Sequence, residues 1–93
     1  MLNALILIRA ERSALQDLGS QLAAIPGVSE VYSVTGRWDF VAIVRVRRHE
    51  QLAEIVTLGL VPLAGILSTQ TMVAFQQFSR HDLEAMFALG EEA

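Results

Sequence analysis

Residues 28–47 have the sequence VSEVYSVTGRWDFVAIVRVR, which predicts the central hairpin of the fold. It contains two segments rich in β-branched residues, 28–36 and 39–47, separated by a short turn around Gly36, Arg37 and Trp38. Two such segments joined by a glycine-containing turn predict an antiparallel hairpin. Alternation along the second segment places four apolar residues on one face: Phe40, Ala42, Val44 and Val46.

A strand and a helix are predicted before the hairpin. Residues 2–9, LNALILIR, are almost entirely apolar, which is typical of a buried strand. Residues 13–25 repeat leucine and isoleucine at helical spacing with polar residues opposite, which predicts an amphipathic helix. Ser13 followed by Gln16 fits a capping box at the start of this helix, and the Pro-Gly pair at 26–27 ends it.

The same order of elements follows the hairpin. Residues 49–61 repeat apolar residues at helical spacing, which predicts a second helix. Residues 66–78, ILSTQTMVAFQQF, predict a fourth strand with Thr69 and Thr71 on one face. A capping box and a short amphipathic pattern then predict a C-terminal helix, on the following residues: Ser79, Asp82, Leu83, Met86 and Phe87.

The order of elements, βαββαβ, predicts an α+β fold class. With a right-handed crossover in each half, it gives a ferredoxin-like four-stranded antiparallel sheet with both helices on one face and an extra C-terminal helix. We therefore expect residues 1–93 to form a single domain.

The opposite face of this sheet is expected to be apolar and uncovered. It includes either Leu5 and Leu7 of the first strand and Val41 and Ile43 of the third, or the residues that point to the other side of these strands. An exposed apolar sheet face marks an interaction surface. We expect two copies to pack sheet against sheet, as in dimeric α/β-barrel proteins, so that no stable folded monomer exists.

Composition supports a self-associating protein of the cytosol. The chain is 53% hydrophobic and only 18% charged, which is more apolar than one small core needs. No apolar run approaches the ~18 residues of a membrane-spanning helix, and the N-terminus lacks the features of a secretory signal. The absence of cysteine excludes disulfides and thiolate metal sites, which fits a cytoplasmic protein.

The charge distribution argues against direct binding to nucleic acid. The net charge is −3 and the sequence pI is about 5.2, whereas a nucleic-acid surface normally has a clustered basic face. The only basic cluster is Arg45, Arg47 and Arg48, which we interpret as a solvated strand end.

The sequence contains no catalytic signature. His49 and His81 have no acidic neighbour at the spacing of a triad or a metal site. Glu11, Glu30 and Asp39 are not brought together by any spacing that would make a carboxylate pair. Because nucleotide-binding and hydrolase motifs are also missing, we expect neither an enzyme nor a metal or cofactor.

The turn TGRWDF, residues 35–40, is the segment most suited to a ligand. Gly36 permits positive φ or a close backbone approach, and Trp38 is the only tryptophan of the chain. Asp39 can accept hydrogen bonds either from turn amides or from an ammonium group. On chemistry alone, a turn stabilised by aspartate and a ligand site are equally good interpretations.

The residues SEVYSVTGRWDFVAIVRV, followed by GILSTQTMVAFQQFSRHDL, resemble the effector-binding domain of the Lrp/AsnC family, also called the RAM domain. The most specific parts are the turn from Val34 to Asp39 and the strand 66–71. Full-length members of that family have an N-terminal helix-turn-helix. This chain begins at the first strand and so resembles the stand-alone form.

The resemblance implies a homodimer of packed sheets, assembly of dimers into rings, for example of four dimers, and binding of a free amino acid or related metabolite between dimers. It also implies regulation of transcription by mixed assembly with full-length members. Family turns often have other residues where Arg37 and Trp38 stand, so ligand preference is expected to differ. The expected ligand contacts are Thr35, Gly36, Arg37, Trp38, Asp39, Thr69 and Thr71.

Two alternatives remain open at this stage. Ferredoxin-like dimers also include small enzymes such as monooxygenases and isomerases, and fold does not decide function. Such an enzyme should place a polar catalytic residue between sheet and helices, where this sequence offers only apolar side chains. The other alternative is a structural assembly unit with an empty site.

Overall fold

The structure is a computed structural model and describes residues 1–80. Its strands and main helices follow the predicted order, with one short helical turn added before the first helix. The elements are β1 (Leu2–Ala10), η1 (Arg12–Ala14), α1 (Leu15–Ala23), β2 (Val28–Ser33), β3 (Phe40–Val46), α2 (His49–Glu54), η2 (Ile55–Leu60) and β4 (Ile66–Ala74).

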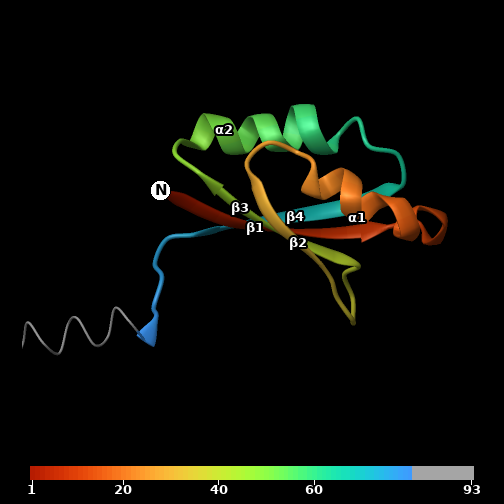
Figure 1. Cartoon of the computed structure of the whole chain (residues 1–93), viewed down its shortest axis with the longest axis horizontal. Helices are drawn as coiled ribbons and strands as arrows, with labels where there is room; N and C mark the ends of the chain where they lie inside the picture. Colours follow the sequence, from red (N-terminus) through yellow and green to blue (C-terminus); the bar gives the residue numbers. More distant parts are fainter. Residues whose placement is uncertain (81–93) are drawn as a thin grey trace, which may run out of the picture.

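The four strands form one antiparallel sheet in the order β2-β3-β1-β4, with the helices together on one face (Figure 1). This is the predicted ferredoxin-like arrangement. The predicted C-terminal helix lies outside the described residues. Among residues 1–80, no helix has both the length and the apolar character needed to cross a membrane.

The core lies between the sheet and the helices. Every second residue of the two central strands, β1 and β3, points into it. Ile6 and Ile8 of β1 are fully buried and pair with Ala42 and Phe40 of β3. The helices contribute Leu18 and Leu22 from α1, Leu52 from α2, and Ile55 and Leu60 from η2. The set predicted for one face of the third strand is buried as expected: Phe40, Ala42, Val44 and Val46.

The start of α1 differs from the prediction. Ser13 does not cap the helix, because it lies inside the 3-10 turn η1, and α1 begins without a side-chain cap. The Glu11 N–H instead donates to the Gly65 carbonyl at 2.8 Å. A Cβ at Gly65 would lie 2.3 Å from the Ala14 Cβ, so this glycine, with φ of +91°, permits close packing of the two loops. A tertiary contact therefore fixes the helix start.

The second helix is also less regular than predicted. The predicted span 49–61 divides into α2 and the π-helical segment η2, in which the Val61 N–H donates to the Val56 carbonyl. Gly59 packs against Ile25 so closely that a Cβ there would lie 2.8 Å from the Ile25 Cγ2. Widened helical turns are rare and frequently lie at functional sites.

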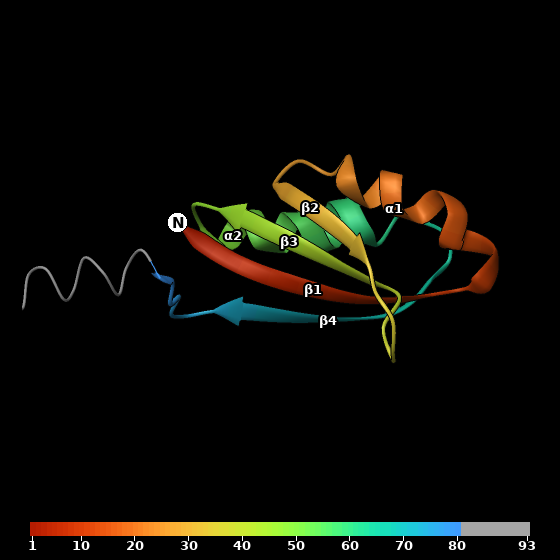
Figure 2. The same cartoon turned by 60° about the horizontal axis from the view of Figure 1, so that its bottom comes forward.

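The last strand ends earlier than predicted. The predicted strand 66–78 ends at Ala74, and residues 75–80 run beyond the sheet at the end where the chain begins (Figure 2). The second predicted strand likewise ends at Ser33, before the turn.

Candidate ligand-binding site

The turn between β2 and β3 projects beyond the sheet. In both views it extends away from the helices (Figures 1 and 2). The Val34 N–H donates to the Asp39 carbonyl at 3.1 Å, which closes the loop. Gly36 has φ of +101° and no heavy atom within 4 Å of where a Cβ would lie. The tip of the turn is therefore open to a partner or ligand.

Asp39 ties this turn to the end of β1. Its N–H donates to the Ile8 carbonyl at 2.9 Å, and its Oδ2 accepts from the Ala10 N–H at 2.8 Å. The second bond lies where the pairing of β1 with β4 shifts, between Arg9 and Ala10. The other oxygen, Oδ1, accepts no hydrogen bond from residues 1–80. One carboxylate thus stabilises the turn and retains a free acceptor.

The five predicted turn residues form one small surface. Thr35, Gly36 and Arg37 are exposed, and Trp38 and Asp39 are half-buried at the base of the loop. In the part of the chain described here, Arg37 forms no ion pair. Backbone amides, a guanidinium and a carboxylate oxygen are therefore available within a single turn.

The two threonines of β4 lie on a different surface. Thr69 pairs with Ile8 and Thr71 with Ile6, so both side chains point to the helix side of the sheet, where they are exposed. The turn projects from the opposite side. The structure therefore does not bring the threonines and the turn together within one chain.

A groove that the sequence did not predict lies beside Thr69. It separates η2 from β4 and has a volume of about 310 Å³. Its lining contains no charged residue and includes Val56, Leu60, Val61, Leu63, Leu67 and Thr69. We call this cavity the η2–β4 groove.

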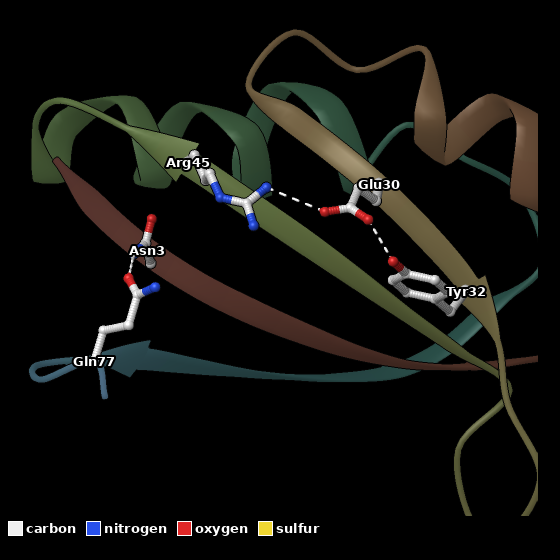
Figure 3. A network of polar contacts seen from close by, with 5 residues as sticks. All are labelled: Asn3, Glu30, Tyr32, Arg45 and Gln77. Carbon is white, nitrogen blue, oxygen red and sulfur yellow. Dashed lines mark hydrogen bonds and ion pairs between the residues drawn. The ribbon is translucent and has the colours of Figure 1, made fainter. Parts of the chain in front are cut away.

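The uncovered sheet face has an apolar centre and a polar rim. Of the two predicted sets, Leu5, Leu7, Val41 and Ile43 lie on this face, and they are half-buried rather than fully exposed. The polar rim is drawn in Figure 3 and consists of Asn3, Glu30, Tyr32, Arg45 and Gln77. In this rim, Arg45 forms an ion pair with Glu30 at 3.2 Å, and Asn3 donates to Gln77 at 3.2 Å.

Glu30 accepts hydrogen bonds from Tyr32 and Arg45 (Figure 3). The bond from the Tyr32 hydroxyl, together with Arg45, lowers the pKa of Glu30 below its ordinary 4.5, and the same carboxylate raises the pKa of Tyr32. A lowered carboxyl pKa stabilises the fold above pH 4.5, and this contribution is lost as pH falls through the lowered value. Both groups are exposed, so the effect on stability is small.

Replacing Tyr32 by Phe should raise the pKa of Glu30 toward its ordinary value, because the largest cause of the shift is removed. Carbon-detected NMR of the Glu30 carboxyl as a function of pH measures this change. Glu50 is an exposed carboxylate on α2 and serves as the internal control. An unchanged titration of Glu30 in Tyr32→Phe would show that the hydrogen bond does not form in solution.

Comparison with known proteins identifies the family. The profile of the Lrp/AsnC ligand-binding domain matches residues 3–83. The chain belongs to the Lrp/AsnC family. An uncharacterised HTH-type transcriptional regulator of Pyrococcus horikoshii, PH1916, is 39% identical over 75 residues, which are 77% of this chain and 50% of the regulator. This Lrp/AsnC chain thus spans about half the length of the curated relatives that it matches.

Solved structures agree with this assignment. TTHA0845 of Thermus thermophilus superposes with a TM-score of 0.81 at 44% identity, over 86% of this chain and all of that one. A feast or famine regulatory protein of M. tuberculosis, solved in complex with L-methionine, superposes with a TM-score of 0.70 at 25% identity. That match covers 85% of this chain and 53% of the regulator.

The homologues of this Lrp/AsnC domain do not favour the enzyme alternative. An enzyme of the same fold should have a polar residue between the sheet and the helices. Within residues 1–80 no polar or charged side chain is buried there, and no group of acidic or histidine side chains could hold a metal. The homologues are transcriptional regulators.

Proposed function

We propose that this Lrp/AsnC domain is a non-catalytic module of the cytosol that binds a free amino acid through its β2–β3 turn. A zwitterion needs an acceptor for its ammonium group and donors for its carboxylate. The free Oδ1 of Asp39 supplies the acceptor, while the backbone amides around Gly36 and the Arg37 guanidinium supply donors. The proposal rests on one observation: a single exposed turn holds both a free carboxylate oxygen and several hydrogen-bond donors.

The site is completed by a second copy of the chain. Thr35 and Trp38 flank the turn, whereas Thr69 and Thr71 lie on the other side of the same sheet. If all of these residues contact one ligand, then the turn and the threonines come from different chains. This requirement supports an association of dimers into a ring, in which the turn of one chain meets the helix side of another. The homodimer itself is supported by the apolar, uncovered sheet face.

Binding of an amino acid is supported by a related structure. The M. tuberculosis regulator, with the same fold and 25% identity, was solved with L-methionine. Because the relatives are transcriptional regulators, we propose that the chain modulates transcription by assembling with full-length members of the family. Its net charge of −3 supports the further proposal that the chain itself makes no direct contact with DNA.

A thermal-shift screen against the twenty amino acids tests the proposed function. A ligand that binds only the folded state stabilises it by about 2.7 kcal/mol at a hundredfold excess over Kd. For a domain of this size each kcal/mol raises Tm by about 4–8 °C. We expect at least one amino acid to raise Tm in a saturable way. If none does so at millimolar concentration, the chain is a structural assembly unit.

A further inference from the structure

Two phenylalanines after β4 are exposed to an unusual degree. Phe75 is 96% exposed and Phe78 is 73% exposed. Residues 75–78, which we call the arm, run beyond the sheet, and the Asn3–Gln77 hydrogen bond holds them at its end (Figures 2 and 3). From Ile66 to Ser79 the sequence contains no charged residue. Such a segment is expected to be covered by another apolar surface.

The η2–β4 groove is an apolar surface of that kind. Val61 is 73% exposed and Leu67 is 56% exposed at its sides. The groove remains open because α1, α2 and η2 cover the other three strands and leave the helix side of β4 bare. Its volume of about 310 Å³ is in the range of small-molecule pockets, so it has room for an aromatic side chain.

The arm cannot fill the groove of its own chain. The groove contacts the start of β4 at Leu67, whereas the arm follows the end of β4 at Phe75. Eight residues of hydrogen-bonded strand separate these two positions by about 27 Å at 3.4 Å per residue. Phe78 is three residues farther along and can return at most about 11 Å. An arm that fills this groove therefore comes from a second copy.

We propose that Phe75 and Phe78 of one copy pack into the η2–β4 groove of a second copy. Both surfaces are apolar and free of charge, so burying one against the other leaves no unpaired charged group. Because the two surfaces differ, each copy can pass its arm to the next copy, and such head-to-tail contacts generate a ring where the rotation closes. This inference rests on the association of dimers proposed above and names the contact that forms it.

Three single substitutions test the contact by sedimentation of the full chain. Phe78→Asp places a charge on the arm and Val61→Asp places one in the groove, and each should reduce wild-type assemblies to dimers. Leu58→Asp is the matched control. Leu58 lies on η2 and is 73% exposed, like Val61, but it does not line the groove. This variant should assemble like wild type.

Mixing the two defective variants gives the decisive result. The Val61→Asp chain keeps an intact arm and the Phe78→Asp chain keeps an intact groove. An equimolar mixture should therefore form a species larger than either variant alone. A contact between two identical surfaces would give no larger species in the mixture. If the mixture forms no larger species, the proposal is wrong.

The remaining outcomes separate this inference from the proposed assembly. If wild type is larger than a dimer but Phe78→Asp and Val61→Asp are equally large, only the arm contact is wrong. If Phe87→Asp reduces the assembly and Phe78→Asp does not, the groove is filled by another segment, and the arm contact is again wrong. If wild type is only a dimer, both the inference and the proposed ring fail, while amino-acid binding is tested separately.

Discussion

Leu7→Asp should abolish the dimer and leave a chain that no longer melts cooperatively. Leu7 lies at the centre of the uncovered sheet face, where it pairs with Val41 on one side and Gln70 on the other. If this face packs against a second sheet, the substitution buries an unpaired carboxylate, which costs several kcal/mol. Small domains have a free energy of unfolding of only about 5–15 kcal/mol, so a loss of several kcal/mol is a large share of it.

Analytical ultracentrifugation and thermal melts followed by circular dichroism measure this effect. Leu58→Asp again provides the control, because it adds the same charge at an exposed leucine outside the sheet. A Leu7→Asp chain that sediments and melts like wild type would show that the face is not an interface. A wild-type chain that is a well-folded monomer at micromolar concentration would contradict the same claim.

Asp39→Asn should weaken amino-acid binding while leaving the fold intact. The asparagine carbonyl can still accept the Ala10 N–H, but the negative charge that would pair with an ammonium is lost. Loss of a hydrogen bond to a charged group costs on the order of 1–3 kcal/mol, or about 5- to 150-fold in affinity. Isothermal titration with the amino acid found in the thermal screen measures the change.

Asp39→Ala separates the two roles of this carboxylate. It removes the acceptor for the half-buried Ala10 N–H as well as the charge, so it should lower Tm in addition to weakening binding. Asp39→Asn should weaken binding at an unchanged Tm. Equal affinity of Asp39→Asn and wild type would show that Asp39 only forms the turn.

The strands and their faces were predictable because alternation is a local signal. Along residues 40–46 every second residue is buried, and Phe40 and Val44 lie in the core as expected. The helix start at Leu15 and the π-helical segment 55–60 were not predictable. Both lie at close contacts with residues distant in sequence, Gly65 and Ile25, which local sequence patterns do not reveal.

The candidate site was predictable only in part. The turn residues, with Gly36 at positive φ, were found from the residue types that such turns require. The bond from Ala10 to Asp39 and the η2–β4 groove depend on tertiary packing that no sequence spacing encodes. The likeness of Thr69 and Thr71 to family positions gave no indication that they lie on the opposite side of the sheet from the turn.

Trp38 provides the most direct measurement of the central claim, that a free amino acid binds at the turn. It is the only tryptophan of the chain and lies half-buried at the base of the turn, so its fluorescence reports on the surroundings of the turn. Titration of wild type with the amino acid that raises Tm should change Trp38 fluorescence saturably, with the Kd obtained by calorimetry. If the amino acid raises Tm but Trp38 fluorescence stays constant, binding occurs elsewhere and the proposed site is wrong.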